Sequence, residues 1–334
     1  MLSIIIVNYN SKVLITQCLK SAMQFESFIN YEWIIVDNNS TDDSKAFLTA
    51  NFPFIHWISM NYNAGFARAN NAGIQVASNS TVLLLNPDTI ILKNALERCL
   101  HKFEQSPHGA CSVQLLNEDG SPQITGSYFM KGGLNHLLPL PYLGNFLRKI
   151  ALGLQAKNTS IKQAMTDVKV DWINGAFLMV KKEIIQQCGL MDEDFFLYAE
   201  EAEWCYRIGK YGPLFVYGDI HITHLQGETI NAETNSPGKG YQNIFDRKGA
   251  QLLVSNLLRI RKQEGVFWYL MNMMIYTAES PIFCIGFFLE YLTHKKENRL
   301  YHFRQLKGYM KNIVLVWKLA PKMLSNKPNF YKVI

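Results

Sequence analysis

Several features that are common in other proteins are scarce or missing in this sequence. Charged residues make up only 18% of its 334 residues, and it contains neither an internal repeat nor a low-complexity tract. Hydrophobic residues account for 48% and aromatic residues for 13%. This composition excludes a disordered chain and predicts a folded protein with one large core or two modest ones.

Cysteine pairs of the C-x-x-C type are also missing, and the cysteine spacings are irregular. We therefore expect reduced, mostly buried thiols, as in cytosolic proteins. The six cysteines are Cys18, Cys99, Cys111, Cys188, Cys205 and Cys284. The first ten residues, MLSIIIVNYN, lack the basic region of a signal peptide, and their apolar run is too short for one. We expect them to form a first strand.

The net charge of +6 and the pI near 8.8 are mildly basic. This balance suits anionic partners such as phosphates, nucleotides and acidic membrane surfaces, but it selects none of them. An average soluble protein can have the same balance.

One hydrophobic run, residues 265–292, is long enough to cross a bilayer. Asn272, Glu279 and Pro281 interrupt it, and a spanning helix with a central Glu and Pro is costly. We therefore expect a broken pair of helices that lies on a membrane or packs on the core.

Short β-branched strands alternate with helical patterns in the first third of the chain. We expect strands at 3–10, 31–40, 55–60 and 80–89, and helices at 12–24, 40–51, 63–77 and 93–105. Ser40 is a candidate N-cap of the second helix, with Asp43 as a weaker capping-box partner. The alternation predicts an α/β fold, with a mostly parallel sheet and helices on both faces.

The rest of the chain is less regular. Residues 117–123 indicate a turn, and the Gly- and Pro-rich stretch from Gly132 to Gly153 predicts a flexible loop or lid. Next come a strand pair with a helix (168–189), an acidic helix (200–210), a late strand with its exit loop (213–228), and a basic, apolar helical region from about residue 240.

Polar residues follow each of the first four expected strands. Ligands of parallel α/β sheets bind beyond the carboxyl ends of the strands. One polar end would indicate a turn, but four ends at one edge favour a binding cleft. The ends are Asn8-Tyr9-Asn10, Asp37-Asn38-Asn39, Asn61 to Asn63 and Asn86-Pro87-Asp88.

Asp88 stands at a strand tip behind Pro87, which suits a ligand for Mg²⁺ or Mn²⁺ when a phosphate supplies further oxygens. The alternative is a helix cap or an N-P-D-T turn. His224 ends the late strand. A lone histidine is more often a satisfied core residue, but beside Asp88 an imidazole ligand is plausible.

Asp37 can accept a hydrogen bond from the N3–H of uracil or thymine, or from a ribose hydroxyl, or it can form an Asx turn. Gly65 permits close backbone approach at a helix N-terminus, and Arg68 in the first turn can reach a pyrophosphate. This segment is neither a Walker A loop nor G-x-G-x-x-G, so it predicts a phosphate site only together with the strand ends.

Three acids, Glu200, Glu201 and Glu203, lie on the acidic helix. Such a run is usually a solvated face. Aromatic neighbours on both sides indicate that part of the helix is buried, and a carboxylate near an apolar wall can serve as a general base.

In order and spacing, seven motifs resemble those of glycosyltransferase family 2 enzymes of GT-A fold, in particular the bacterial rhamnosyltransferase-like branch. The resemblance covers roughly residues 3–228. The motifs are SIIIVNYN, IIVDNNSTDDS, NAGFARANNAGI, LLLNPDT, WINGAFLMVKKE, DEDFFLYAEEAEWCYR and HITH.

The resemblance implies three parts: a nucleotide-sugar half (1–115), an acceptor-binding and catalytic half of the same domain (116–235), and a C-terminal helical, membrane-associating region (236–334). It implies a UDP- or dTDP-sugar donor, such as dTDP-rhamnose, and a glycan or lipid-linked glycan acceptor. It implies no nucleic-acid partner. The expected location is the cytoplasm, at the inner membrane's cytoplasmic face.

It also implies residue roles. Asp37 would bind the base, and Gly65 and Arg68 would face the diphosphate. Asn86 to Asp88 stands in place of a D-x-D metal motif, so that Asp88 and His224 would hold Mg²⁺ or Mn²⁺. Glu201 takes the place of the general base, beside Glu200. The remaining donor-site residues would be Asn8, Tyr9, Asn10, Asn39 and Asn63, and the sugar and acceptor cleft would include Asp171, Trp172, Asn174 and Gly175.

The implied reaction is a single inverting displacement in a metal-dependent enzyme. Two other hypotheses remain. Asn86 and Glu201, which differ from the usual acids, are compatible with an inactive sugar-nucleotide binder. A nucleotidyltransferase is disfavoured because NYNSK replaces the Gly-rich loop after the first strand.

The basic C-terminal residues Lys295, Lys296, Arg299, Arg304 and Lys307 would meet anionic headgroups, unless these helices form a cap or an oligomer interface. The sequence does not predict the oligomeric state.

Overall fold

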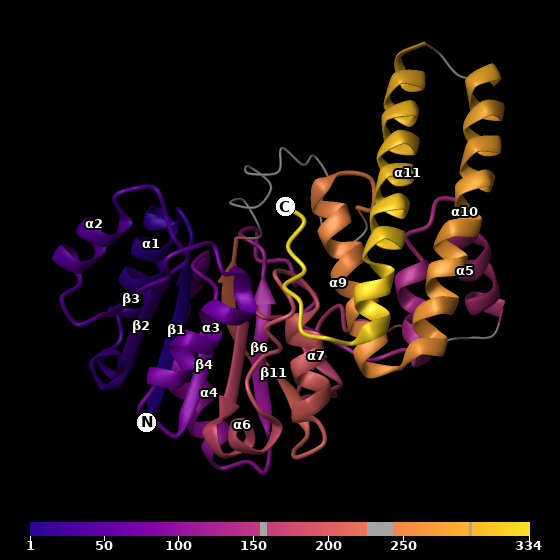
Figure 1. Cartoon of the computed structure of the whole chain (residues 1–334). Helices are drawn as coiled ribbons and strands as arrows, with labels where there is room; N and C mark the ends of the chain where they lie inside the picture. The colour runs from indigo at the N-terminus through magenta and orange to yellow at the C-terminus, as the bar shows by residue number, and fades with distance from the viewer. Residues whose placement is uncertain (154–158, 226–242, 294–295) are drawn as a thin grey trace. The chain divides into compact units, whose positions relative to one another are not determined.

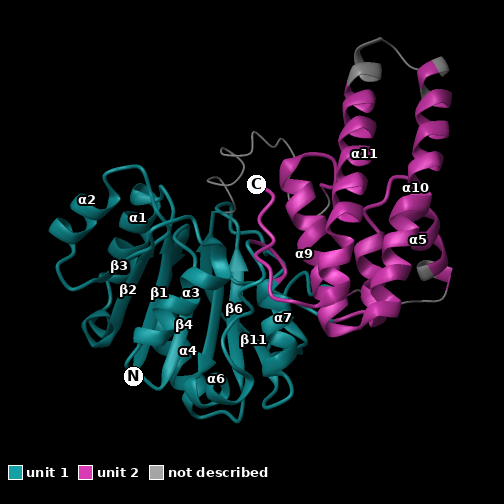
Figure 2. Cartoon of the chain, viewed as in Figure 1, with its two compact units in different colours: residues 1–128, 160–196, 200–229 teal, residues 129–159, 197–199, 230–334 magenta. Residues whose placement is uncertain are grey.

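The structure is a computed structural model that describes residues 1–153, 159–225, 243–293 and 296–334. The chain divides into two compact units (Figure 2). The first unit comprises residues 1–128, 160–196 and 200–229, and the second comprises 129–159, 197–199 and 230–334. The further division of residues 1–235 into a donor half and an acceptor half stays a prediction.

A mixed sheet forms the centre of the first unit (Figure 1). Its strands are β1 (Leu2–Asn8), β2 (Glu32–Asp37), β3 (His56–Ser59), β4 (Thr81–Leu85), β5 (Thr89–Ile91), β6 (Ala110–Leu116), β8 (Val168–Val170), β10 (Phe177–Lys181) and β11 (Leu214–His224). The order is β3-β2-β1-β4-β10-β6-β11-β5, with β8 paired to β11. Pairing is parallel from β3 to β4 and between β6 and β11, and antiparallel elsewhere. β7 (Gly126–Ser127) and β9 (Trp172–Ile173) form a separate antiparallel pair.

Helices cover both faces of this sheet, which confirms the predicted fold class. Ile4 and Ile6 of β1 belong to one buried cluster, whereas Ile5 belongs to the other. This alternation is the two-residue period of a strand. The helices are α1 (Lys12–Ala22), α2 (Ser44–Asn51), α3 (Gly65–Val76), α4 (Ala95–Glu104), α6 (Lys182–Cys188) and α7 (Glu200–Ile208), with a 3-10 turn η1 (Glu26–Asn30). A sheet buried on both faces holds its strand ends in fixed positions.

Two local predictions in this unit are wrong. The expected strand 80–89 ends at Leu85, because Pro87 has no N–H to continue the ladder, and β5 is a separate strand. Ser40 is not the N-cap of α2, which begins at Ser44 with Asp43 at the cap position. The hydroxyl of Ser40 instead accepts hydrogen bonds from Asn8 Nδ2 and the Asn10 N–H.

All six cysteines are free thiols, as predicted. Cys284 is exposed and Cys188 is partly buried. The other four are buried.

The second unit is helical. Its elements are the 3-10 segment η2 (Lys131–Leu137), α5 (Leu143–Gly153), α9 (Arg247–Gln263), α10 (Val266–Thr293) and α11 (Lys296–Ser325). The prediction of a flexible loop at 132–153 is therefore wrong. Gly132 and Gly133 have positive φ angles of 67° and 68°, and a Cβ on either would collide with Trp268 or Ile260. These glycines permit close packing rather than mobility.

The prediction of a broken helix pair at 265–292 is also wrong, because α10 is one helix with Pro281 inside it. Contacts within the unit satisfy some of its buried polar groups. Asn272 Nδ2 donates to Gly132 O at 2.8 Å, and the carboxylate of Glu279 accepts from the N–H groups of Tyr142 and Leu143 at 2.7 and 3.0 Å. Burial raises the pKa of Glu279, and these two bonds oppose the rise.

By length and composition alone, residues Val266–Leu289 of α10 are long and apolar enough to cross a membrane. Only 33% of the most apolar window is buried in the structure. A single helix of this kind is weak support for a span, since core helices of soluble proteins have the same composition.

Candidate active site

The ends of β1 and β2 hold Asp37 in a fixed orientation. Asn8 lies beside Asp37 in the strand register and donates from Nδ2 to Asp37 Oδ1 at 2.8 Å. The Ser40 N–H donates to the other carboxylate oxygen at 3.3 Å. Asn10 and Asn39, which follow the two strands, adopt left-handed backbone conformations. Tyr9 is partly buried beside Asn10. These contacts orient a carboxylate that can accept a hydrogen bond from a ligand.

Asn38 organises the start of α3, a role that the sequence analysis did not assign. Its side chain donates to Asn63 Oδ1 and to the Gly65 carbonyl at 3.1 and 3.2 Å, and it accepts from the Ala64 N–H at 2.7 Å. Gly65 has a φ of 75°, and a Cβ there would lie 2.1 Å from the carbonyl oxygen of Phe196. Glycine is required here by both the backbone angle and the close approach.

Arg68 extends from the first turn of α3 toward the segment that precedes α7. Its Nε–H donates to the carbonyl oxygen of Glu193 at 3.0 Å, and Nη1 donates to the Tyr62 hydroxyl at 3.1 Å. The predicted contact between Arg68 and a diphosphate stays a prediction.

Asp88 and His224 meet where β5 and β11 pair. His224 lies opposite Thr89 in the register, and the Leu225 N–H donates to the Asp88 carbonyl at 2.9 Å. His224 Nε2 is 3.4 Å from Asp88 Oδ1 and 3.3 Å from Asn86 Nδ2. His224 is 7% exposed and Asp88 8% exposed. The structure brings these two residues together although 136 positions separate them, and their role as metal ligands stays a prediction.

This pair fits a divalent cation of the Mg²⁺ or Mn²⁺ class. One carboxylate oxygen and one imidazole nitrogen are suitable ligands, and such ions often take only one or two ligands from the protein when a phosphate supplies the rest. Among the described residues no group of three or more His, Cys, Asp or Glu side chains could hold a metal. A metal at Asp88 and His224 would therefore depend on a bound diphosphate for its remaining ligands.

Glu200 and Glu201 are buried in the first turn of α7, at 2% and 6% exposure. A Cβ added at Gly175 would lie 3.7 Å from the Cβ of Glu201. The residue after Gly175 is linked to the end of β4, because the Asn86 N–H donates to the Ala176 carbonyl at 3.0 Å. The segment 175–176 therefore connects the base candidate with the strand end that carries Asp88.

Glu203 has a structural role. Its two carboxylate oxygens accept hydrogen bonds from Nε and Nη2 of Arg207, both at 2.7 Å. This bidentate pair ties Glu203 to Arg207 on the same helix.

The turn that leads into α7 has a strained backbone. Tyr198 and Ala199 have φ angles of 70° and 65°, which cost about 1–3 kcal/mol each for residues other than glycine. Within the second unit, the Ser255 hydroxyl of α9 donates to the Leu197 carbonyl at 2.7 Å and fixes the start of this turn.

The predicted acceptor residues lie on and around β9. Asp171 is exposed, and its N–H donates to the Ser127 carbonyl at 3.0 Å. Trp172 is partly buried and pairs with Ser127. The side chain of Asn174 accepts from the Ala176 N–H at 2.9 Å, which shapes the turn beside Glu201. Their contact with an acceptor stays a prediction.

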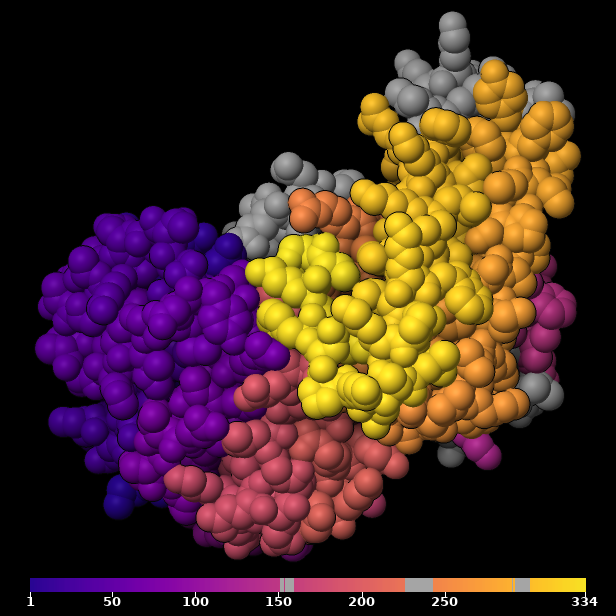
Figure 3. All heavy atoms as spheres, viewed as in Figure 1, coloured from indigo at the N-terminus to yellow at the C-terminus, as the bar shows by residue number. Residues whose placement is uncertain are grey.

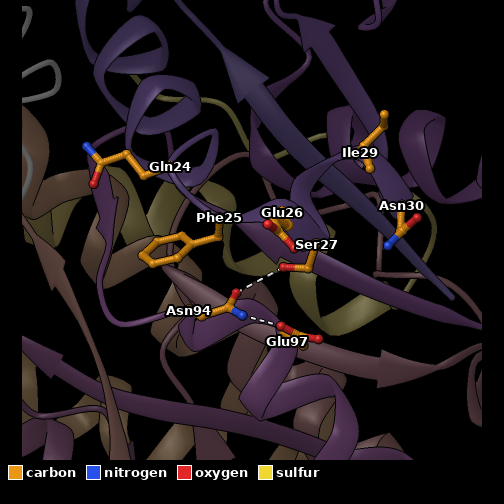
Figure 4. Close-up of a pocket in the computed structure, with 8 residues that line it drawn as sticks. All are labelled: Gln24, Phe25, Glu26, Ser27, Ile29, Asn30, Asn94 and Glu97. Atoms are coloured by element: carbon orange, nitrogen blue, oxygen red, sulfur yellow. Dashed lines mark hydrogen bonds between the residues drawn. The ribbon is translucent and has the colours of Figure 1, made fainter.

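A separate pocket of about 690 Å³ lies at η1 and the start of α4 (Figure 4). Ser27 donates to Asn94 there at 2.9 Å, and Asn94 donates to Glu97. None of the predicted site residues lines it. It is formed by Gln24, Phe25, Glu26, Ser27, Ile29, Asn30, Asn94 and Glu97.

Comparison with known proteins gives a family match. The model of the family described as "Glycosyl transferase family 2" matches residues 3–173, about half of the chain. The chain is 29% identical over 218 residues to the low-salt glycan biosynthesis hexosyltransferase Agl10 of Haloferax volcanii, covering 62% of this chain and 61% of that protein. It is 27% identical over 278 residues to the dTDP-rhamnosyl transferase RfbF of Shigella flexneri, covering 77% of this chain and 83% of that protein.

The fold is similar to that of the mannosyltransferase PcManGT from Pyrobaculum calidifontis, which was solved with GDP-Man and Mn²⁺. That comparison has a TM-score of 0.54 at 14% identity and covers 95% of this chain and 87% of the other. At this identity the likeness shows the fold alone, and it confirms the GT-A type of architecture.

Proposed function

Because the chain belongs to glycosyltransferase family 2, we propose that it moves a sugar from a UDP- or dTDP-sugar to a hydroxyl of a glycan or lipid-linked glycan, with inversion, in cell-surface polysaccharide synthesis. The observation that carries this proposal is the link through residues 175–176 between the Asp88–His224 pair and Glu201. This link supports a single site in which Asp88 and His224 would face the diphosphate and Glu201 would be the base.

The donor side begins at Asp37. A carboxylate held by Asn8 suits the N3–H that uracil and thymine share. The name of the Shigella relative supports dTDP-rhamnose as the donor. The relatives are named as transferases, which does not favour the hypothesis of an inactive binder.

In the proposed reaction Glu201 accepts the proton of the acceptor hydroxyl. The hydroxyl oxygen attacks the anomeric carbon, and the bond from that carbon to the diphosphate oxygen breaks, so the nucleoside diphosphate leaves with the bonding electrons. Arg68 would offset the negative charge that develops on the diphosphate. Mg²⁺ or Mn²⁺ bound at Asp88 and His224 would supply further charge neutralisation. No covalent enzyme intermediate is needed.

A thermal-shift panel tests the first step. It compares UDP-glucose, dTDP-rhamnose and GDP-mannose, each with and without Mn²⁺. We expect the UDP or dTDP sugar to raise the melting temperature more with Mn²⁺ than without it, because a ligand that binds only the folded state stabilises it. If no nucleotide sugar stabilises the protein, the proposal fails. If only GDP-mannose does so, the assignment of Asp37 to uracil or thymine fails.

We also propose that the second unit contacts an anionic membrane surface. Exposed basic residues recur along α11 at helical spacing and lie within about 60° of one another around its axis. They are Arg304, Lys307, Lys311, Lys318 and Lys322. Beside them runs an exposed apolar stripe of Met310, Val314, Trp317 and Leu324. Figure 3 shows that much of α11, in yellow, lies on the surface of the second unit.

This pairing of a basic and an apolar stripe is typical of surfaces that lie on acidic lipid headgroups. Of the predicted headgroup contacts, Arg304 and Lys307 are part of the basic stripe. Lys295 lies outside the described residues, as do the side chains of Lys296 and Arg299.

A further inference from the structure

Gln123 is a buried glutamine at the end of the turn 117–123, shortly before β7, and it is 4% exposed. Its side-chain nitrogen is surrounded by acceptors. Nε2 donates to the carbonyl oxygen of His224 at 2.6 Å, to Asn117 Oδ1 at 2.8 Å and to the carbonyl oxygen of Leu116 at 3.3 Å. Because two of these acceptors are main-chain carbonyls, which cannot donate, the orientation of the amide is fixed.

The amide oxygen of Gln123 therefore faces His224, with Oε1 3.0 Å from the ring Nδ1. An amide oxygen can only accept, so Nδ1 must carry the hydrogen of this bond. In the neutral imidazole the other nitrogen, Nε2, then presents a lone pair. Nε2 is the nitrogen that lies 3.4 Å from Asp88 Oδ1.

Gln123 is itself held in place. Its main-chain N–H donates to the Leu115 carbonyl at 2.8 Å, and its carbonyl accepts from Gln114 Nε2 at 2.8 Å. Gln114 is buried, and its side-chain oxygen accepts from the Ala164 N–H at 2.7 Å. A buried, fully bonded network of this kind leaves the Gln123 amide little freedom to turn.

We propose that Gln123 is a positioning residue that fixes the tautomer of His224, so that Nε2 is offered to a divalent cation held with Asp88. The inference rests on the metal site of the proposed function. A hydrogen bond from the remote nitrogen of a histidine ligand sets which nitrogen binds the metal, and removing such a partner typically weakens metal binding about 10- to 100-fold.

The first test reads the tautomer without any metal. Protein labelled with ¹⁵N-histidine gives ring-nitrogen shifts that distinguish Nδ1–H from Nε2–H, and the loss of one signal set in His224→Gln assigns His224 among the eight histidines. We expect Nδ1–H in the wild type and a shift toward Nε2–H in Gln123→Met, which removes the acceptor at nearly constant volume. An unchanged tautomer in Gln123→Met would overturn the inference.

The second test measures Mn²⁺ affinity by the electron paramagnetic resonance of free Mn²⁺, with dTDP and with UDP present. We expect Gln123→Met to bind Mn²⁺ about 10- to 100-fold more weakly than the wild type. The matched control is Gln251→Met, because Gln251 is also a buried, hydrogen-bonded glutamine but belongs to the second unit and has no part in the network around Gln123. It should keep the wild-type tautomer and an affinity within about threefold of the wild type. An equal loss in both variants would mean that Gln123 acts only through general stability.

The role of Gln123 in setting the tautomer can be tested separately from the metal site. If the wild type binds no Mn²⁺ with either nucleotide while the tautomer changes as expected, the metal site fails and the role of Gln123 in setting the tautomer holds. If Gln123→Met does not fold, Gln123→Glu replaces it. That variant keeps an acceptor oxygen, so Nδ1 should remain protonated, and loss of the proton from Nδ1 would overturn the inference.

Discussion

Asp88 supplies the negative charge of the segment 86–88 alone, because Asn86 is a neutral amide. The Asn86 side chain contacts His224 Nε2, whereas the Asp88 carboxylate lies beside the same nitrogen and can bind a cation directly. We expect Asp88→Ala to lower the transfer rate roughly 100-fold or more, and Asn86→Ala to lower it about tenfold or less. The measurement is the rate of sugar transfer with Mn²⁺, and equal losses would show that the metal site is arranged differently.

Some residues of the site could be predicted from the sequence, and others could not. Asp37 and Asp88 stand at the ends of apolar strands, so strand prediction alone brings them to one edge. Gln123 carries no such signal, because it follows a turn and its contact with His224 spans 101 positions. Within the second unit, the hydrogen bond from the Ser255 hydroxyl to the Leu197 carbonyl, 2.7 Å long, also has no local sequence signal.

Most helices and strands of the first unit could be predicted, because their apolar residues repeat with the helix or strand period and a short stretch of sequence is enough to recognise it. The helical structure of the segment 132–153 could not be predicted in this way, because its glycines and prolines are typical of a loop. Its structure depends on distant groups, as when Glu279 binds the N–H groups at the start of α5, 136 and 137 positions away. The same bonds explain why a carboxylate is tolerated inside the apolar helix α10.

At the element scale, η2 and α9 make a pH-sensitive contact. Arg259 Nη2 donates to His136 Nε2 at 2.7 Å, and the Tyr276 hydroxyl donates to the His136 carbonyl. Burial and the adjacent charge of Arg259 hold the pKa of His136 well below 6.5. As the pH falls below 6.5, His136 is therefore protonated in the unfolded chain but stays neutral in the folded chain. The contribution of the buried, neutral His136 to the free energy of unfolding is therefore present above pH 6.5 and is lost as the pH falls below it.

We expect the free energy of unfolding of the wild type to fall more steeply below pH 6.5 than that of His136→Gln. The measurement is urea unfolding of both proteins across this range. Subtracting the free energies of unfolding of the two proteins at each pH removes the contribution of Glu279, which both proteins contain. The raised pKa of Glu279 acts in the opposite direction, because its contribution to stability falls as the pH rises above 4.5. Parallel curves for the two proteins would contradict the assignment.

On the scale of the whole molecule, the small net charge of +6 conceals a local concentration of positive charge on α11. We expect Lys311→Glu/Lys318→Glu to weaken binding to phosphatidylcholine vesicles that contain phosphatidylglycerol by about tenfold or more, since each basic residue near such a surface contributes roughly 1 kcal/mol. Co-sedimentation measures this binding.

The matched control is Lys20→Glu/Lys45→Glu, which changes the net charge equally at exposed lysines of the first unit. It should bind the vesicles nearly as well as the wild type. Equal weakening in both double variants would mean that net charge rather than α11 governs the binding. If the α11 variant binds the vesicles as well as the wild type, the basic stripe of α11 does not contribute to membrane binding.

The base assignment is the central claim, and one measurement tests it most directly: the rate of nucleoside diphosphate release, with Mn²⁺, from the donor that stabilises the protein most. It is made on Glu201→Gln and on the matched variant Glu200→Gln, with donor affinity measured for both. We expect Glu201→Gln to lose about 100- to 10,000-fold in rate while its donor affinity stays within about threefold of the wild type, and Glu200→Gln to lose far less. A wild-type rate in Glu201→Gln, or a larger loss in Glu200→Gln, would contradict the assignment.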